Sequence, residues 1–320
     1  MNKTTVVIPN YNGIKYLENC LSSLMKGTVV PHVILVDNAS NDGSRQLAEE
    51  KFEGIEIIAF EENTGFCKAV NAGIRAASTE YVLLLNNDTV ADPQMVACLQ
   101  EALEREPKAF SVASKMINLN ETGKLDDAGD LYSALGWAYA RGKDKPVSCY
   151  ENAGRIFSAC AGAAIYRRSV FEEIGYFDEN HFAYLEDMDI GYRANIYGFK
   201  NLYEPKARVF HAGSGVSGSR HNEFKVKLSS RNNVYLIWKN MPLVQILINL
   251  PFLLAGCLIK ILFFYRKGLG KVYVKGLGAG IRLSFSEEGR RNRVRFSARN
   301  IKNYVWIQLQ LFKGMLLRLF

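Results

Sequence analysis

The sequence predicts an α/β fold with a mainly parallel sheet. Two observations lead to this class: short segments that are apolar at every position recur along the chain, and segments with helical spacing of their leucines lie between them. Strands without polar alternation are typical of parallel sheets that helices cover on both faces. The chain has 320 residues, 48% hydrophobic and 22% charged, and this composition excludes a disordered or fibrous protein.

The expected elements alternate regularly. Strands are expected at residues 5–9, 32–36, 55–60 and 81–85. Helices are expected at residues 16–26, 44–52, 66–77 and 95–106. Residues 120–155 are polar and rich in glycine, so we expect a long variable excursion there.

Charge divides the chain into two unequal parts. Residues 1–198 hold 18 Lys+Arg and 28 Asp+Glu, whereas residues 199–320 hold 22 and 4, which together give the net charge of +8. A basic C-terminal part favours an anionic partner, such as phospholipid, nucleic acid or a phosphorylated substrate. The six cysteines are scattered without a C-x-x-C pair, which indicates reduced thiols, and the N-terminus predicts no secretory signal.

Polar residues directly follow several of the predicted strands. Pro9 and Tyr11 follow the first strand, Asp37 follows the second, and residues 86–88 follow the fourth. Because ligands bind at the carboxyl ends of such strands, we expect these residues to meet at one rim of the sheet. No G-x-G-x-x-G motif and no Walker lysine loop follows the first strand, which argues against a hydride-transfer enzyme and a P-loop NTPase.

Three further features are candidates for chemistry. Asp88 either caps a turn or binds a hard cation such as Mg²⁺ or Mn²⁺. Glu186 and Asp187 follow an aromatic stretch, and a desolvated carboxylate there has a raised pKa and can act as a general base. For Asp189 and Arg193, spaced i,i+4, we expect a helical surface pair. His211 precedes the Gly/Ser-rich loop Gly213-Ser214-Gly215 and is either structural or a ligand near phosphates.

In this order, the segments resemble the family 2 glycosyltransferases with the GT-A fold. The matching segments are Val-Ile-Pro-Asn-Tyr-Asn (7–12), Val-Asp-Asn-Ala-Ser-Asn-Asp-Gly-Ser (36–44), Asn-Thr-Gly-Phe (63–66) with Asn71, Leu-Asn-Asn-Asp (85–88), Gly-Tyr-Phe-Asp-Glu (175–179), Glu-Asp-Met-Asp (186–189) and His211. The resemblance covers about residues 4–240. Residues 186–193, with Arg231 and Asn232, are similar to the rhamnosyltransferase branch of bacterial polysaccharide assembly.

The resemblance implies inverting transfer of a sugar from a nucleotide diphosphate donor, either dTDP- or UDP-linked. It makes Asp187 the catalytic base, and Asp88 and His211 the ligands of Mg²⁺ or Mn²⁺. The nucleotide side would comprise Pro9, Tyr11, Asp37, Asn63, Lys68, Asn71, Asn86 and Asn87. Gly162, Ala163 and Glu186 would line the sugar and acceptor side. Asn86 stands where the family's Asp-x-Asp motif has its first acid, which removes a charged contact to the ribose.

We expect a catalytic domain at residues 1–240 and a basic, apolar helical extension at residues 241–320. Residues 241–265 are strongly apolar but contain Gln245, Asn249 and Lys260, which favours an interfacial or re-entrant segment over a spanning helix; an ordinary buried helical pair is the alternative.

The last twenty residues predict an amphipathic helix on an anionic membrane surface, or else a dimer or domain-packing helix. Its apolar face would carry Ile301, Val305, Leu309, Phe312, Leu316 and Phe320, and its polar face Lys302, Asn303, Gln310, Lys313 and Arg318. These features predict peripheral or monotopic association with the cytoplasmic side of the cell membrane.

The expected function is transfer of a sugar, L-rhamnose from dTDP-rhamnose being the best choice, to a hydroxyl of a lipid-linked saccharide in cell-surface polysaccharide assembly. UDP-linked N-acetylglucosamine, galactose or glucose are alternative donors, and a non-catalytic sugar-nucleotide binder and a processive synthase are rival classes. Nucleic acid is not an expected partner, because the basic tail alternates with aliphatic runs and lacks interleaved stacking aromatics.

Overall fold

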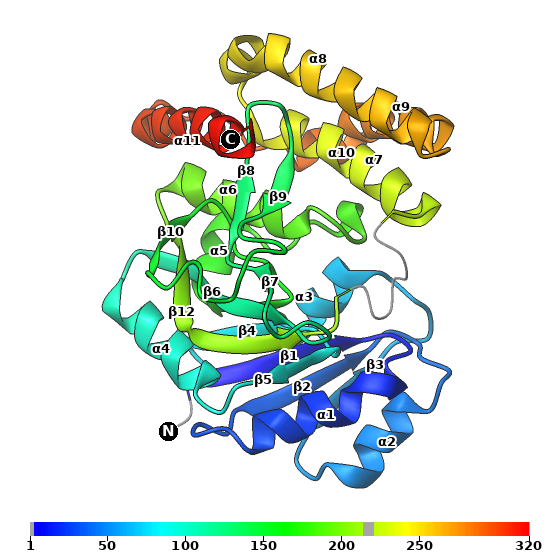
Figure 1. Cartoon of the computed structure of the whole chain (residues 1–320), viewed down its shortest axis with the longest axis vertical. Helices are drawn as coiled ribbons and strands as arrows, with labels where there is room; N and C mark the ends of the chain where they lie inside the picture. Colours follow the sequence, from blue (N-terminus) through cyan, green and yellow to red (C-terminus); the bar gives the residue numbers. More distant parts are fainter. Residues whose placement is uncertain (1–2, 214–220, 320) are drawn as a thin grey trace.

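The computed structural model describes residues 3–213 and 221–319 of the chain (Figure 1). The strands are β1 (Thr4–Asn10), β2 (His32–Asp37), β3 (Glu56–Ala59), β4 (Tyr81–Leu85), β5 (Thr89–Ala91), β6 (Ala109–Asn118), β7 (Leu125–Asp127), β8 (Asp130–Tyr132), β9 (Ala138–Ala140), β10 (Gly154–Ile156), β11 (Ala163–Arg167) and β12 (Lys200–His211). The helices are α1 (Ile14–Met25), α2 (Ser44–Lys51), α3 (Phe66–Ala76), α4 (Met95–Arg105), α5 (Val170–Ile174), α6 (Glu186–Tyr197), α7 (Glu223–Asn240), α8 (Leu243–Arg266), α9 (Gly270–Phe285), α10 (Glu287–Arg291) and α11 (Ile301–Leu319), with short 3-10 turns at Glu179–His181 and Ala298–Asn300.

A ten-stranded mixed sheet forms the centre of the fold. Its main path runs β10-β12-β6-β11-β4-β1-β2-β3, with β5 paired to β12 and β7 paired to β6. The neighbours among β1 to β4 are parallel, as is the β6–β12 pair, while β11 runs antiparallel to both of its neighbours. The α/β class with a mainly parallel sheet is confirmed, and the four predicted strands and four predicted helices end within two residues of their expected bounds.

Two apolar clusters cover the two faces of this sheet. On one face Leu17 of α1 and Leu99 of α4 pack against strand residues such as Leu83. On the other face Val70 of α3 and Ile190 of α6 do the same. The strands are apolar at every position because both of their faces are buried.

Residues 120–155 are more ordered than the sequence predicts. β7 joins the edge of the central sheet by pairing with β6, and Leu125 and Asp127 on it are buried. β8 and β9 form a separate hairpin that reaches the C-terminal helices (Figure 1). The segment brings the carboxylates of Asp126 and Asp127 into the protein interior, while its ends at residues 120–124 and 151–155 are exposed.

The helices α7 to α11 form a layer on the far side of α6 from the sheet (Figure 1). A third apolar cluster joins this layer to the rest of the chain, with Tyr132 of β8, Tyr192 of α6, Leu236 of α7 and Leu311 of α11 as members. The part of the chain after residue 240 therefore shares a core with the part before it.

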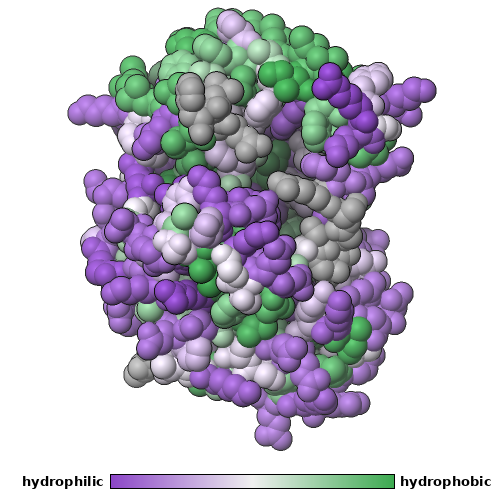
Figure 2. Space-filling model, in the orientation of Figure 1, coloured by the Kyte–Doolittle hydropathy of each residue, from purple (hydrophilic) through white to green (hydrophobic). Residues whose placement is uncertain are grey.

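Among the described residues, α8 is the one helix long and apolar enough to cross a membrane by length and composition. Only 11% of its most apolar window is buried. Figure 2 shows the corresponding apolar surface, in green, over the end of the molecule that the C-terminal helices form.

The pair Asp189 and Arg193 is correct as an i,i+4 contact but wrong as a surface pair. Its N···O distance is 2.9 Å, and both side chains are buried on α6. Lys239 of α7 donates to the same Asp189 oxygen at 2.8 Å. Packing of α6 between the sheet and the C-terminal helices excludes the solvent that a surface pair would face.

Candidate active site

Asn10, at the end of β1, connects the strand ends of the rim. Its Nδ2 donates to Asp37 Oδ1 at 2.9 Å, and its Oδ1 accepts from Asn87 Nδ2 at 2.7 Å. A side chain at Gly13 would place its Cβ 2.1 Å from that Asn87 nitrogen, so a larger residue would displace the hydrogen-bonded pair of Asn10 and Asn87. The rim residues expected after β1, β2 and β4 do lie together.

The nucleotide-side candidates differ in how accessible they are. Tyr11 is 40% exposed, whereas Asp37 is buried and its Oδ2 accepts from the Ser40 amide at 3.1 Å. Asn63 is exposed and accepts from Asn38 Nδ2 at 3.0 Å. Tyr11 and Asn63 are therefore accessible to a ligand in this structure, while Asp37 is already bonded within the protein.

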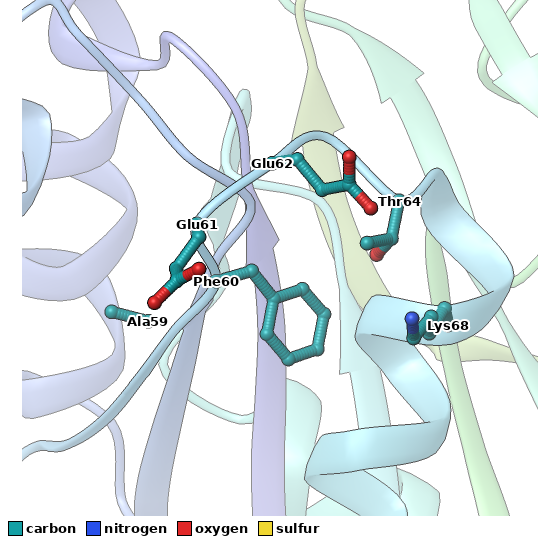
Figure 3. A pocket seen from close by; sticks show the side chains of 6 residues that line it. All are labelled: Ala59, Phe60, Glu61, Glu62, Thr64 and Lys68. Atoms are coloured by element: carbon teal, nitrogen blue, oxygen red, sulfur yellow. The ribbon is translucent and has the colours of Figure 1, made fainter.

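An open pocket lies where β3 ends (Figure 3). Its lining residues are Ala59, Phe60, Glu61, Glu62, Thr64 and Lys68. Figure 3 shows the Lys68 side chain on α3 beside this pocket. The pocket adjoins the predicted nucleotide side, and Lys68 contributes a positive charge there.

Asn71 has a different place from the other nucleotide candidates. It is buried on α3, where its Nδ2 donates to the Phe177 carbonyl at 2.8 Å and its Oδ1 accepts from the Phe177 amide at 3.1 Å. The Asn71 side-chain amide thus forms two hydrogen bonds with the backbone of Phe177, as a residue of a neighbouring strand would.

Asp88 and His211 are in direct contact. His211 Nε2 lies 3.1 Å from Asp88 Oδ1, and His211 Nδ1 lies 2.8 Å from Asp126 Oδ2. Lys143 forms an ion pair with the same Asp126. Burial lowers the pKa of His211, but hydrogen bonds to Asp126 and Asp88 outweigh it and raise the pKa to about 9.

These residues fit a divalent cation of the Mg²⁺ or Mn²⁺ class. A carboxylate oxygen and an imidazole nitrogen on one side of a site are suitable ligands for Mn²⁺. A histidine that binds a metal through Nε2 commonly donates its other N–H to a carboxylate, and Asp126 occupies that position at His211. A metal ion held by Asp88 and His211 would bind the Nε2 lone pair, so His211 would have to be neutral when the metal is bound.

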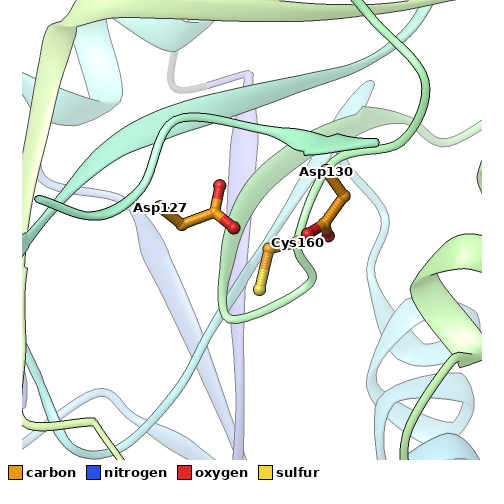
Figure 4. Close-up of side chains that lie close together, drawn as sticks. All are labelled: Asp127, Asp130 and Cys160. Carbon is orange, nitrogen blue, oxygen red and sulfur yellow. The ribbon is translucent and has the colours of Figure 1, made fainter. Parts of the chain in front are cut away.

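Two aspartates and a cysteine form a second cluster of side chains (Figure 4). The polar atoms of Asp127, Asp130 and Cys160 are all within 4.8 Å of one another. Burial raises the pKa of Asp127 to about 7, and the charge of Asp126 adds to this. Burial, with the charges of Asp127 and Asp187, raises the pKa of Asp130 as well. Two carboxyl groups this close to each other disfavour the ionisation of both at once.

Glu186 and Asp187 begin α6 next to this pair. Burial raises the pKa of Asp187, and the Met188 amide donates to its Oδ1 at 2.6 Å. Burial and the neighbouring Asp187 charge raise the pKa of Glu186, whose buried Oε2 has no hydrogen-bond partner among the described residues. Within the part of the chain that the structure describes, the start of α6 therefore presents two carboxyl groups that form no ion pair with a cation.

The turn before Asp187 has an unusual backbone. Phe182, Tyr184 and Leu185 all have φ between 63° and 71°, a conformation that costs a non-glycine residue about 1–3 kcal/mol. Asn232 of α7 donates to the Tyr184 carbonyl at 2.7 Å, and Arg231 donates to the Asn180 carbonyl at 2.7 Å. The Arg231-Asn232 motif thus holds the strained turn that places Asp187.

The sugar-side candidates line the same region. The Asn86 amide donates to the Gly162 carbonyl at 2.9 Å, and Ala163 pairs with Leu85 across β11 and β4. Ser158 Oγ donates to the Asp187 carbonyl at 2.5 Å. The segment before β11 therefore lies between the end of β4 and the start of α6.

The structure brings Asp88, His211, Asp126 and Asp187 into one region and gives Asn71 a separate structural position. Ser214 and Gly215 of the expected phosphate loop lie outside the described residues. Sequence reasoning missed Asp126, Asp127 and Asp130. Their signal was the dense run Leu-Asp-Asp-Ala-Gly-Asp at 125–130, within a segment expected to be variable.

Comparison with known proteins identifies the family of this chain. The family described as Glycosyl transferase family 2 matches residues 5–175. An N-acetylglucosaminyl-diphospho-decaprenol L-rhamnosyltransferase of Mycobacterium tuberculosis is 28% identical over 239 residues, which cover 67% of this chain and 77% of the relative.

Two solved structures are similar in fold. S. aureus TarS in complex with UDP-GlcNAc has a TM-score of 0.61 at 17% identity, covering 98% of this chain and 89% of that one. The mannosyltransferase PcManGT from Pyrobaculum calidifontis, in complex with GDP-Man and Mn²⁺, has a TM-score of 0.53 at 15% identity, covering 99% and 87%.

Proposed function

Because this chain belongs to glycosyl transferase family 2 and has the GT-A fold, we propose that it transfers L-rhamnose from dTDP-rhamnose to a hydroxyl of a lipid-linked saccharide. One observation carries the proposal: Asp88 and Asp126 both contact His211, and Asp126 is followed by the buried acids Asp127 and Asp130, whose pKa values burial and the nearby Asp187 charge raise. The similarity to a rhamnosyltransferase with a lipid-linked acceptor supports the choice of donor and acceptor.

The donor would lie along the rim of the sheet. Tyr11 and Asn63 would face the nucleotide, with Lys68 providing positive charge near it. Asp88 and His211 would hold Mg²⁺ or Mn²⁺, which when bound stabilises the negative charge of the departing diphosphate. Asp126 would keep His211 oriented with Nε2 toward that position.

Asp187 would act as the general base in a single inverting displacement. Its carboxylate removes the proton from the acceptor hydroxyl while that oxygen attacks the anomeric carbon, and the bond to the diphosphate breaks. Burial raises its pKa to about 6, which makes it a stronger base than a solvated aspartate while it stays mostly ionised at neutral pH. Glu186 and the Asp127–Asp130 pair would accept hydrogen bonds from sugar hydroxyls.

A UDP-linked donor is the second candidate. The similar structure of TarS contains UDP-GlcNAc, and Asn86, in place of an acid, leaves the ribose side of the site without a charge that would discriminate between nucleotides. N-acetylglucosamine, galactose or glucose would then be the sugar.

We place the protein at the cytoplasmic side of the cell membrane, in peripheral or monotopic association with an anionic surface. The basic residues after position 240 and the lipid-linked acceptor of the M. tuberculosis relative support this location. Residues 1–240 would carry catalysis and residues 241–320 the membrane association.

A donor-hydrolysis panel tests the proposed function. Purified full-length protein is incubated with dTDP-rhamnose, UDP-GlcNAc, UDP-galactose and UDP-glucose, each with Mn²⁺, with Mg²⁺ and with EDTA. We expect dTDP-rhamnose to be hydrolysed fastest, and only with metal. Hydrolysis of a UDP-sugar alone would establish the alternative, and hydrolysis of no donor would contradict both.

A further inference from the structure

α8 has its polar residues inside and its apolar residues outside. Gln245 and Asn249 are buried at 5% and 0% exposure, whereas Leu247, Leu254 and Leu258 are 57–62% exposed. A surface helix of a water-soluble protein has the opposite arrangement. A contiguous exposed apolar surface marks a contact with a membrane or another protein.

The buried side of α8 is attached to the protein along most of its length. Near its start Gln245 accepts from the Tyr192 hydroxyl of α6 at 2.7 Å. One turn later Asn249 and Gln308 of α11 exchange two hydrogen bonds of 2.8 Å. In the middle, Trp137 Nε1 donates to the Gly256 carbonyl at 3.2 Å.

The close approach at Gly256 depends on glycine. A Cβ there would lie 2.2 Å from the Leu135 carbonyl oxygen of the β8–β9 turn. Toward the C-terminal end, the Phe264 ring stacks on Tyr273 of α9 with centroids 4.9 Å apart. Attachments from residue 245 to residue 264 span about 28 Å at 1.5 Å per residue, so α8 lies along the helical layer instead of projecting from it.

The neighbouring helix α11 adds apolar side chains to the exposed surface. Ile307 and Leu311 on one side of it are buried in the shared core. Val305, Leu309 and Leu316 on the other side are 54–60% exposed. The exposed residues belong to the apolar face that the sequence predicts for this helix; Phe320 lies outside the described residues. Figure 2 shows the apolar surface at this end of the molecule.

The positive charge of residues 241–320 indicates which partner the apolar surface of α8 and α11 contacts. Residues 241–320 contain fourteen Lys+Arg but only two Asp+Glu, and Arg266, Lys267 and Lys271 near the end of α8 are exposed. A second copy of the chain would bring two positive surfaces together, which disfavours self-association. An anionic bilayer complements both the apolar and the basic residues.

We propose that α8 and α11 dock on an anionic lipid bilayer with α8 lying in the membrane plane and its outer leucines inserted. This proposal rests on the proposed function and deepens it. Helix α6, which carries Asp187, packs against the docked helices. An acceptor anchored in the same membrane would therefore be close to Asp187. Length and composition make α8 a candidate membrane span. On this proposal α8 is instead a monotopic anchor.

Vesicle flotation of the full-length protein tests the docking. We expect the protein to float with vesicles of phosphatidylglycerol and phosphatidylcholine, and the double variant Leu254→Glu/Leu258→Glu to partition at least tenfold less, because two inserted leucines are lost. Val30→Glu, a change at a 52% exposed valine before β2, serves as the matched control and should float like the unaltered protein. Equal flotation of the double variant would overturn the proposal.

Depth measurements distinguish an α8 helix that lies in the membrane plane from one that spans the membrane. A fluorescent unnatural residue is placed singly at Leu247, Leu254 or Leu262, and quenching by lipids spin-labelled at known depths is recorded. Equal depths at the three positions support the in-plane arrangement. A label at position 254 much deeper than the other two would show a span and overturn it.

Two further readouts keep this proposal distinct from the proposed function. The double variant should hydrolyse donor at the unaltered rate in solution, and Asp187→Asn should float normally. Light scattering without lipid should show the same mass for the double variant and the unaltered protein. A larger mass that the substitutions abolish, without vesicle binding, would assign the surface to a second copy and overturn the lipid proposal.

Discussion

Asp187 and Asp189 are two residues apart on one helix, yet their surroundings are opposite. Asp189 accepts from Lys239, Arg193 and Asn240 within 3.1 Å, and despite its burial the charges of Lys239 and Arg193 hold its pKa below the usual range. Asp187 has the Met188 amide as its donor, and burial raises its pKa.

Buried charges in this protein are of two kinds: balanced charges that stabilise the fold, and unbalanced acids that are candidates for function. The network of Asp178, Asp189, Arg193 and Lys239 is balanced and joins α6 to α7. Among residues 3–213 and 221–319, no Lys or Arg forms an ion pair with Asp127, Asp130, Glu186 or Asp187, and burial raises all four pKa values. Perturbed, unbalanced acids cluster at functional sites, so substitutions in the two groups should have different effects.

The largest expected effect is on catalysis at Asp187. Asp187→Asn keeps the shape of the side chain but removes its ability to accept a proton, so transfer should fall by about 10²–10⁴-fold. Transfer is measured with radiolabelled donor and a lipid-linked acceptor, and folding by thermal melting. Near-normal turnover in a folded variant would remove Asp187 from the role of base.

The second largest effect is expected on the free energy of unfolding, when Lys239 is removed from its network with Asp178 and Asp189. Lys239→Met leaves Asp178 and Asp189 buried without their shared cation, which should cost about 3–5 kcal/mol of unfolding free energy. Urea denaturation of the variant measures this, with the exposed Lys267→Met as the control. A loss below 1 kcal/mol would show that the network contributes little.

A smaller effect is expected on metal affinity. Asp126→Asn weakens the support of His211, so Mn²⁺ affinity should fall about 10–100-fold. Isothermal titration of Mn²⁺ into the protein without donor gives the affinity directly, and Asp144→Asn, an exposed acid of the same segment, is the control. Unchanged affinity would mean that Asp126 does not position the ligand.

The smallest effect is the pH dependence, which should differ between activity, through Asp187, and stability, through Asp189. Asp187 must be ionised to act as base, and burial raises its pKa to about 6, so activity should fall roughly tenfold per pH unit below that value. The pKa of Asp189 is lowered, so its stabilising contribution is present above about pH 4, the usual aspartate value, and is lost only as pH falls further. Activity profiles and acid-unfolding curves should therefore diverge between pH 4 and 6; coincident curves would contradict the distinction.

The sequence predicts the sheet part of the molecule well. Thr4–Asn10 and Tyr81–Leu85 are apolar at nearly every position, because a strand buried on both faces admits few other residues. The meeting of Asp88 and His211 could not be calculated from spacing, since β12 joins the sheet through long-range pairing with β5 and β6.

The remaining features depend on tertiary contacts that leave little local signal. β7 has only three residues, and nothing in its sequence shows that pairing with β6 brings Asp126 to His211. Gln245 and Asn249 form a polar stripe at i,i+4, which on a soluble helix indicates the solvent side. The structure buries this stripe because Tyr192 and Gln308 provide its hydrogen-bond partners.

Metal-dependent nucleotide binding tests whether one site contains both a metal-binding half, with Asp88 and His211, and a base half, with Asp187. The affinity for dTDP and UDP is measured by calorimetry with and without Mn²⁺ for Asp88→Asn, His211→Asn and Asp187→Asn. The first two variants should lose the increase in affinity that Mn²⁺ gives, and Asp187→Asn should retain it in full. An unchanged increase in Asp88→Asn and His211→Asn, or an equal loss in all three variants, would contradict this division of the site.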